Sequence, residues 1–455
     1  MRIEATALQN DIDMITEDHT NPTHYTYDVF VKGGGAQVLA LKMESYYIKR
    51  DYLKGYSDEA ILVGWFVEQD VVDVMLPNAQ DLDVIVSRRP LAPPEADYGW
   101  EGEGLVERYR GSMLDVTVPE VGEDNTVDRD KRNTMKRVSF QLIDRAIYEL
   151  RLTSVGGTYR AATAADTLNT VLTATSTSLE LDEAVRPLGV DFYPADTQLK
   201  ADGTPNVRDH LIVPDGVKLA DLAAYLHNNC GGIYNNGIGC YYQDRLWYVF
   251  PLYDNSRYNK ASRTLNIVRV PAESLPDVPA SYTKLGSHLF ILGTGEALSI
   301  DTTNPQSLNA GSGTIFTTAS GLFDRYAPSS TPDAVVDQSQ VIGRISIDQR
   351  QDGMSATVYS KQRITDNVAK QISNLSAARQ SVMQLGWGYS DPSLVYPGMP
   401  VRVMYNKAGI VETKQGTVVG MESFVEMAQP GMATKHYRCK SVLTLLVTDA
   451  PDNVV

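Results

Sequence analysis

Cysteine is scarce in this sequence, and its spacing matches no common disulfide or metal-binding pattern. Only three of the 455 residues are cysteines, Cys230, Cys240 and Cys439, and no CxxC occurs. An odd number of cysteines without repeated spacing does not form a disulfide framework. We therefore expect synthesis in a reducing compartment, with Cys230 and Cys240 serving as small apolar fillers.

Positive charge is also in short supply. The chain has 41 Lys and Arg residues against 56 Asp and Glu residues, which gives a formal net charge of -15. A dedicated nucleic-acid binder needs cationic patches that neutralise phosphates, so this class of protein is disfavoured. The acidic balance still allows a surface past which nucleic acid slides without sticking, because an acidic wall repels phosphate.

Long hydrophobic runs are missing from the sequence. The longest apolar stretch, residues 60–67, is far shorter than the roughly 20 residues that span a bilayer. The first residues include Glu4, Asp11 and Asp13, and no apolar run follows them. We therefore predict no secretory signal and no membrane insertion by this chain.

Signatures of catalysis and cofactor binding are missing as well. The sequence has no HExxH, GxSxG or GxxxxGK(S/T) pattern, and Gly293-Thr-Gly-Glu does not match GxGxxG. No two histidines lie four residues apart, and His227, near a predicted helix end, is interpreted as structural. We predict no catalytic, cofactor-binding or metal-ligating residue, and hence a protein that is not an enzyme. The histidines are His19, His24, His210, His227, His288 and His436.

Two groups of carboxylates are the alternatives to that prediction. Asp81 and Asp83 would lie on one face of a strand, and Glu101 and Glu103 form a second pair; glycosidases use two carboxylates in a cleft. Residues 123–130 offer oxygen donors for calcium but lack the glycine and the terminal glutamate of an EF-hand. Because acidic chains form such groups by chance, we favour a solvated surface for all of them.

Tyrosine, in contrast, is abundant, with 25 residues against 9 phenylalanines. Many of the tyrosines stand near predicted strands, and no acid-base set accompanies them, so we favour a role in protein interfaces. They include Tyr46, Tyr47, Tyr52, Tyr56, Tyr241, Tyr242, Tyr248 and Tyr253, with Trp247 beside them.

The composition is that of a globular protein with about three domains, at 43% hydrophobic and 21% charged residues. The first 118 residues alternate short apolar runs with turn signals, which indicates a β-barrel or sandwich. Glycines 33–35 predict a tight turn between two of these strands. The predicted strands are Val29–Lys32, Gln37–Met43, Ala60–Glu68, Asp70–Leu76, Leu82–Arg89 and one or two within Val106–Val118.

The middle of the chain mixes helices and strands. The polar run 120–133 reads as an exposed loop or domain junction, and residues 135–152 are strand-like or mixed. A helix is predicted within 161–172. A second unit has a strand ending at Pro214, a helix with Leu219, Leu222 and Leu226 on one stripe, and a hairpin over 238–250.

The remainder is again β-rich, with one long predicted helix. Residues 361–385 carry apolar side chains at helical spacings, and Gly386 follows them. This stripe is interpreted as a core face, with a short partner seam as the alternative. The segment 301–340, rich in Ser, Thr, Asn, Gly, Ala and Pro, reads as a long surface excursion. Strands are predicted at 264–270, 289–292, 400–405, 410–420, 437–440 and 442–447.

Two segments resemble a known group of proteins. One begins Leu211-Ile-Val-Pro-Asp-Gly and continues through Gly231-Gly-Ile-Tyr-Asn-Asn-Gly to the hairpin that ends at Pro251. The other is Tyr396-Pro-Gly-Met-Pro-Val-Arg-Val-Met-Tyr, followed by Gly416-Thr-Val-Val-Gly. Both are similar to the central baseplate hub proteins of contractile-tailed bacteriophages, whose barrels recur in tail hub and spike-base proteins.

The resemblance implies a mainly β fold with an α+β insertion. Two tail-tube-like β-barrel domains would occupy residues 1–118 and 256–455, the latter with the long helix 361–385, and an inserted α+β domain would occupy 119–255. Such hub proteins are homotrimers, so three copies present six barrels in a pseudo-sixfold ring. That ring matches a hexameric tail tube on one side and a trimeric spike on the other.

The implied function is that of a structural virion component, a baseplate hub that joins tail tube to spike and forms part of the DNA ejection channel. The implied partners are the tail tube or tube-initiator protein, the spike protein and the baseplate wedge proteins. Genomic DNA would pass through the lumen without specific binding. The protein would reside in the virion tail baseplate after assembly in the host cytoplasm. The alternatives are a peripheral wedge or tube-initiator protein, and a glycan-cleaving tail enzyme.

Overall fold

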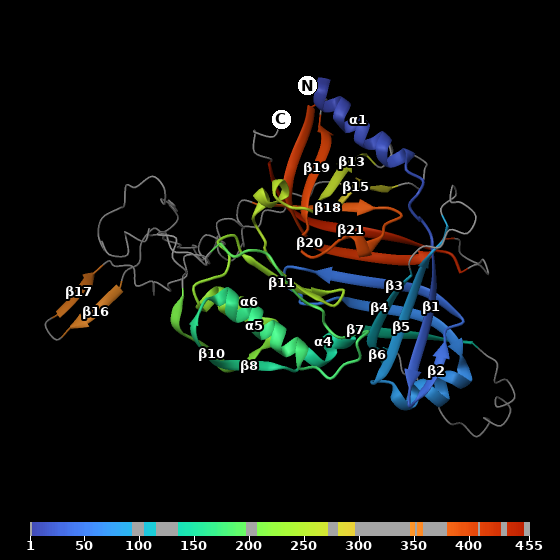
Figure 1. Ribbon diagram of the computed structural model, residues 1–455, viewed down its shortest axis with the longest axis horizontal. Coiled ribbons are helices and arrows are strands. Elements are labelled where there is room, and N and C mark those ends of the chain that lie inside the picture. Colours follow the sequence, from blue (N-terminus) through green and yellow to red (C-terminus); the bar gives the residue numbers. More distant parts are fainter. Residues whose placement is uncertain are drawn as a thin grey trace.

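The computed structural model is mainly β, as the sequence predicts, and its strands form two joined barrels with an α+β domain beside them (Figure 1). No helix within the described part of the chain is long and apolar enough to cross a membrane. The structure describes residues 2–92, 104–114, 135–196, 207–271, 281–295, 346–350, 353–357, 380–407, 410–428 and 435–449.

The first barrel, barrel 1, is a ring of strands in the order β20-β3-β4-β7-β6-β5-β1-β21, closed by pairing between β21 and β20. Tyr25 of β1 pairs with Tyr437 of β21, and this residue pair completes the ring. A short strand, β2, continues the hairpin from β1 through a turn at Gly34 and Gly35, where the sequence predicts it. The strands are β1 (Tyr25–Gly33), β2 (Ala36–Leu39), β3 (Lys42–Asp51), β4 (Glu59–Val67), β5 (Leu82–Pro90), β6 (Leu105–Met113), β7 (Met135–Asp144), β20 (Ile410–Met427) and β21 (Tyr437–Asp449).

Barrel 1 closes because its strands bury every second residue, which places one apolar face inside the ring. In β5 the buried positions are Leu82, Val84 and Val86, and the residues between them are less buried. The same alternation in β1 buries Val29 and Val31. These side chains fill the barrel with one continuous apolar core.

The second barrel, barrel 2, uses β20 and β21 again. Its order is β18-β21-β20-β19-β13-β15, and a bridge between Thr294 and Gly386 joins the last strand to the first. Both backbone hydrogen bonds of that bridge are present, at 2.8 and 2.6 Å. The edge strand β14 adds to β15. The strands are β13 (Leu265–Arg269), β14 (Tyr282–Leu285), β15 (His288–Gly293), β18 (Ser381–Trp387) and β19 (Pro400–Lys407).

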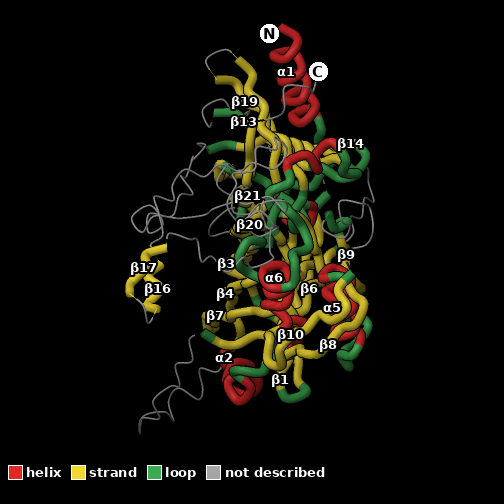
Figure 2. The backbone as a smooth tube through the Cα atoms, turned by 90° about the vertical axis from the view of Figure 1, so that its left-hand side faces the viewer, coloured by secondary structure: helices red, strands yellow, loops and turns green. Residues whose placement is uncertain are grey.

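The two barrels share β20 and β21 because these strands are long enough to change partners along their length. Residues 410–417 of β20 pair with β19 in barrel 2, and residues 420–426 pair with β3 in barrel 1. The register of β20 against β21 shifts between Val418 and Gly420, at this change of partner. Such a bulge bends the strand and increases its twist. The side view of Figure 2 shows barrel 2 above barrel 1.

Helix α1 (Arg2–Glu17) covers the outer face of barrel 2. Leu8, Ile12 and Ile15 lie on one side of the helix at spacings of four and three residues. They pack against Val268, Leu292 and Met404, which point outward from barrel 2. This barrel therefore has apolar side chains on both faces of part of its wall.

The inserted domain packs two helices against small sheets. Thr163 caps α5 by accepting a hydrogen bond from the Asp166 amide, and Leu168 and Leu222 of the two helices lie in the core. In both views the helices lie at the level of barrel 1 (Figures 1 and 2). Its elements are α4 (Arg145–Leu150), β8 (Ser154–Ala162), α5 (Ala164–Thr177), β9 (Gly189–Phe192), β10 (Arg208–Lys218), α6 (Leu219–Asn229), β11 (Ile238–Gln243) and β12 (Leu246–Pro251).

The structure draws the domain boundaries differently from the sequence prediction. Barrel 1 is not complete within residues 1–118, because it also needs β7 and the distal halves of β20 and β21. The inserted domain begins after β7, not at residue 119, and the region 256–455 contributes to both barrels. Sequence patterns show strand segments but not which barrel each half of a long strand enters.

The structure corrects the predictions for two short segments. Residues 70–76 are helical rather than extended, within α2 (Glu68–Asp70), the π-helix η1 (Val71–Met75) and the 3-10 helix η2 (Leu76–Asn78). This segment buries Val71 and Met75, four residues apart, as a helix does. The strand β10 does not end at Pro214; it continues to Lys218 across a register shift.

The long helix predicted at 361–385 is wrong at its C-terminal end. Residues from 381 onward form strand β18, which buries Met383, Leu385 and Trp387 at every second position. Apolar residues at a spacing of four positions fit both a helix and a strand. Here the apolar residues also alternate at every second position, as in a strand. Residues 361–379, the excursion 301–340 and the polar run 120–133 lie outside the described residues.

We predict that Gly416→Ala destabilises the protein by about 2 to 4 kcal/mol in chemical denaturation. A Cβ atom at position 416 would lie 1.8 Å from the carbonyl oxygen of Leu446 in β21, so the shared strands would have to separate. The control is Gly388→Ala, where a Cβ meets nothing within 4 Å, and which should change stability by less than about 1 kcal/mol. Equal effects of the two substitutions would contradict this account.

Candidate functional site

The loop between β18 and β19 lies where the two barrels and the inserted domain meet. This junction loop, residues 388–399, includes the 3-10 helix η7 (Pro392–Leu394), which Asp391 caps by accepting a hydrogen bond from the Ser393 amide. It contacts β3 and β5 of barrel 1 and β11 of the inserted domain. We treat this three-way junction as the candidate functional site, because it sets how the three units are placed.

A buried ion pair links barrel 1 to the junction loop. Arg88 of β5 lies 3.0 Å from Asp391 and also donates to the Ser393 hydroxyl at 3.1 Å. Burial opposes ionisation of Asp391, but Arg88 and the hydrogen bonds from Ser393 outweigh it and hold the pKa of Asp391 below its ordinary value. The guanidinium of Arg88 also lies over the ring of Tyr25, 4.7 Å from its centroid.

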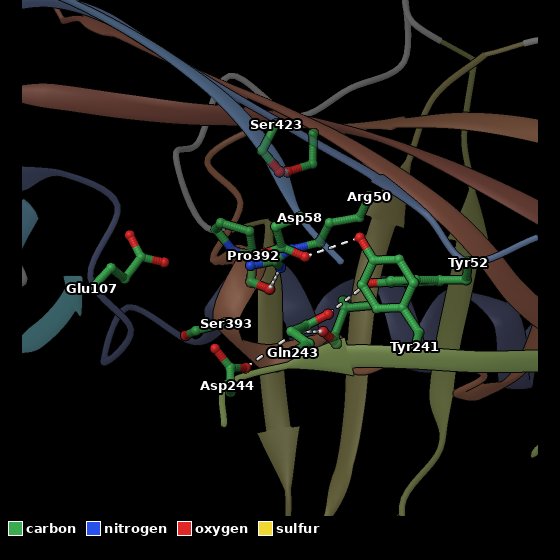
Figure 3. Close-up of polar contacts among 12 residues, drawn as sticks. Arg50, Tyr52, Asp58, Glu107, Tyr241, Gln243, Asp244, Pro392, Ser393 and Ser423 are labelled. Atoms are coloured by element: carbon green, nitrogen blue, oxygen red, sulfur yellow. Dashed lines mark hydrogen bonds and ion pairs between the residues drawn. The ribbon is translucent and has the colours of Figure 1, made fainter. Parts of the chain in front are cut away.

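A second buried ion pair joins all three units (Figure 3). Arg50 of β3 contacts Asp58 at 2.8 Å and donates to the carbonyl oxygen of Pro392 in the junction loop at 2.8 Å. The other oxygen of Asp58 accepts a hydrogen bond from Tyr241 of β11 at 3.1 Å. One buried carboxylate and one guanidinium thus connect barrel 1, barrel 2 and the inserted domain.

A neutral pair completes this network. The Tyr52 hydroxyl donates to the side-chain oxygen of Gln243 at 3.0 Å, and the amide nitrogen of Gln243 donates to the carbonyl oxygen of Val395 at 3.0 Å (Figure 3). The rings of Tyr52 and Tyr241 meet edge to face, with centroids 4.7 Å apart. The amide side chain therefore fixes β11 against both the end of β3 and the junction loop.

A layer of serine hydroxyls separates the two barrel cores along the shared strands. Ser423 of β20 and Ser390 of the junction loop each hydrogen-bond to Ser441 of β21, at 2.9 and 2.8 Å. All three residues are buried. Val425 on one side belongs to the core of barrel 1, and Met421 on the other side belongs to the core of barrel 2.

Packing at this junction explains the glycine of the Pro-Gly-Met motif. Gly398 has a φ of +71°, which favours glycine, and a Cβ there would lie 2.2 Å from the ring of Phe250 in β12. Phe250 belongs to the strand that ends the other motif segment. The two segments that carry the sequence resemblance thus contact each other, and Gly416 and Gly420 of the second lie where β20 changes partner.

The carboxylate pair Asp81 and Asp83 faces one way, as the sequence predicts. Both contact the guanidinium of Arg110 on β6, and Asp83 also lies 3.8 Å from Arg145. The two carboxylates share a cation on an exposed part of barrel 1 and do not line a cavity described here. Glu101, Glu103 and the candidate calcium loop 123–130 lie outside the described residues.

The remaining candidate residues lie in packed surroundings. His227 is buried in the last turn of α6. All three cysteines are free thiols; burial raises the pKa of Cys240 to about 12 and that of Cys439 to about 11, which opposes thiolate formation. No group of three or more His, Cys, Asp or Glu side chains in the described residues is arranged to hold a metal ion.

Several of the abundant tyrosines are buried inside the chain, and their role in interfaces with other proteins stays a prediction. Tyr52 and Tyr241 lie buried at the three-way junction, Tyr46 is buried in barrel 1, and Tyr242 is buried with Trp247 in the inserted domain. The residues that sequence reasoning missed are Arg50, Arg88, Asp58 and Asp391. Arg88 had one local signal, because it continues the inward alternation of Leu82, Val84 and Val86.

Comparison with solved structures finds similar folds at low sequence identity. The tail protein from Neisseria meningitidis MC58 is 12% identical, with 92% of this chain and 96% of that chain covered and a TM-score of 0.45. An E. coli component of the type VI secretion system, described as similar to T4 bacteriophage tail proteins, is 8% identical over 93% and 77%, with a TM-score of 0.42.

The 43 kDa tail protein of prophage MuSo2 from Shewanella oneidensis is 11% identical over 92% of this chain and 96% of that chain, with a TM-score of 0.40. Two of these three proteins are described as tail proteins, and the third as similar in structure to bacteriophage tail proteins. No protein-family model and no curated protein sequence matches the chain.

We predict that Arg88→Met lowers the free energy of unfolding by about 3 to 5 kcal/mol, because it leaves the Asp391 carboxylate buried without its cation. Arg89→Met is the matched control: this neighbouring arginine pairs with Asp28, but its side chain is 63% exposed, so the loss should stay below about 1 kcal/mol.

The double variant Arg88→Met/Asp391→Asn separates charge burial from lost packing. We expect it to be more stable than Arg88→Met alone, because the uncompensated carboxylate is gone. Chemical denaturation measures all three free energies. If the double variant were less stable than Arg88→Met, burial of an unpaired charge would not be the cause of the loss.

Proposed function

We propose that the chain is a structural hub of a contractile-tail baseplate, which joins a hexameric tail tube to a trimeric spike. The observation that carries this proposal is the pair of barrels built on the shared strands β20 and β21. A chain with two barrels in a fixed arrangement offers two tube-like units per copy. Three copies around an axis then present six tube-like barrels. Such a ring can match a hexameric tail tube on one side and a trimeric spike on the other.

The proposal requires that the two barrels keep one relative orientation. Two features support this rigidity. Both barrels contain β20 and β21, and these two strands are hydrogen-bonded to each other from one barrel into the next. The buried ion pair Arg88–Asp391 also links barrel 1 to the loop that precedes β19. A flexible linker between barrels would not specify a ring.

The charge of the chain fits a wall of a DNA channel. With a net charge of -15, the surface of an assembled ring would repel phosphate, so genomic DNA would pass without specific binding. In this proposal the partners are two further copies of the chain, the tail tube or tube-initiator protein, the spike protein and the wedge proteins. The site of action is the tail baseplate of the virion, after assembly in the host cytoplasm, and no chemical reaction is involved.

We predict that the purified chain forms a homotrimer, three times its 50.1 kDa mass, alone or with its spike protein. Sedimentation velocity or native mass spectrometry measures this mass. Cryo-electron microscopy of the assembled particle then locates the chain. Threefold copies on the axis support the hub, sixfold peripheral copies support a wedge protein instead, and a strict monomer that binds no tube or spike protein would refute the proposal.

A further inference from the structure

A cavity of about 290 Å³ separates barrel 1 from the inserted domain, and acidic side chains line it from both sides. Glu107 comes from β6 and Asp144 from the end of β7, while Asp244 comes from the turn between β11 and β12. We propose that this cavity is a proton-dependent joint: it holds the inserted domain closed against barrel 1 when its carboxyl groups are protonated, and loosens when they ionise. The joint is a property of the single chain and does not depend on the proposed assembly.

Beside the cavity, the Asp58–Tyr241 and Tyr52–Gln243 hydrogen bonds of the three-way junction already join barrel 1 to the inserted domain, and main-chain contacts also cross the joint. Tyr242 pairs with Ser57 in an isolated parallel bridge, and its amide donates to the carbonyl oxygen of Tyr56 at 2.8 Å. Within the inserted domain, the amide of Leu188 donates to the carbonyl oxygen of Arg245 at 2.7 Å. The turn at residues 244–245 therefore lies between the β3–β4 loop of barrel 1, which contains Tyr56 and Ser57, and the 184–188 segment of the inserted domain.

Two of the arginines near the cavity, Arg50 and Arg245, have partners in the structure, and Arg108 of β6 is exposed. Arg50 pairs with Asp58. Arg245 points its guanidinium at the backbone carbonyl oxygens of Arg186 and Glu183. In the described part of the chain no ion pair reaches Asp144, whose carboxylate accepts hydrogen bonds from the amides of the first turn of α4. The other charged or titratable side chains that line the cavity are Glu107, Arg108, Tyr109, Tyr242 and Asp244. The charge of Arg88 acts on Glu107, and the Tyr46 hydroxyl donates to Glu107 at 3.1 Å.

Burial and like charges act together on Asp144. Burial raises the pKa of Asp144 to about 7, the two backbone amides oppose this rise, and the negative charges of Asp58 and Asp244 add to it. Burial also raises the pKa of Glu107, against the influence of Arg88 and Arg50. The charge of Asp144 therefore changes most steeply near pH 7.

The sign of the effect follows from linkage. A carboxyl group whose pKa is higher in the closed state binds its proton more tightly there, so closure is favoured below the ordinary pKa of about 4 and this advantage is lost as the pH rises through about 7. For Asp144 alone, the ratio of open to closed joint should rise about tenfold between pH 6 and pH 8. Ionised Asp144 then repels Asp58 and Asp244 across the cavity.

Hydrogen-deuterium exchange of the full chain tests the joint, with rates corrected for the intrinsic effect of pH. We expect protection of the Tyr242 amide, which donates across the joint to Tyr56, to fall about tenfold from pH 6 to pH 8, while β13 and β19 in barrel 2 stay unchanged. Equal protection at both pH values, or a loss spread evenly over both barrels, would overturn the proposal.

Two variants identify the groups that titrate. Asp144→Asn keeps an oxygen that accepts the α4 amides, so the helix cap survives, and with Glu107→Gln it should reduce the change in protection to less than about twofold. Asp209→Asn, on the exposed strand β10, is the matched control and should retain the full change. If the double variant retained the wild-type pH response, the cavity carboxyl groups would not be its source.

Discussion

The shared pair of long strands is the constraint on which the rest of this structure depends. β20 supplies backbone donors and acceptors to β19 over its first half and to β3 over its second half, while β21 pairs along most of its length. Neither barrel closes without these strands, so each barrel needs the register that the other also uses. Gly416 is required because β20 and β21 approach more closely there than any side chain allows.

The polar groups at the junction determine geometry more than they add stability. A buried ion pair seldom outweighs the desolvation of its two charges, whereas an unpaired one is costly. Displacing Asp58 from Arg50, or Asp391 from Arg88, would leave buried charges unpaired. Arrangements of the three units that separate these residues are therefore disfavoured. The apolar cores alone would tolerate small rotations between barrels, because dispersion and burial are not directional. The directional contacts fix the angle at which the barrels meet.

Local patterns in the sequence predicted much of the secondary structure, because they depend on neighbouring residues. The turn after β1, the α6 stripe and the β11–β12 hairpin all follow from spacing within about a dozen positions. The sharing of strands and the ion pairs were beyond such reasoning. Arg50 and its Pro392 partner lie 342 residues apart, and no local feature of either residue indicates the other.

The errors in the prediction also have a physical pattern. The segment 70–76 is rich in valine, which favours strands, but its burial in barrel 1 through Val71 and Met75 suits a helix turn that covers the barrel end. The domain boundaries differ from the prediction for another reason. β20 is one continuous strand, and its sequence does not indicate where it changes partner from β19 to β3. Tertiary context decided both cases against local preference.

The arrangement of charge distinguishes a rigid part of the molecule from an adjustable one. Between the two barrels each buried carboxylate has its own arginine, as in Arg88–Asp391. Barrel 1 and the inserted domain also share the buried pair Arg50–Asp58, to which Tyr241 donates, but in the cavity beside it acidic groups outnumber arginines and Asp144 accepts its hydrogen bonds from backbone amides. Paired charges resist displacement, whereas unpaired carboxyl groups respond to protons. In this proposal the barrel pair is the fixed frame, and the contact of the inserted domain with barrel 1 at the cavity is the part that depends on pH.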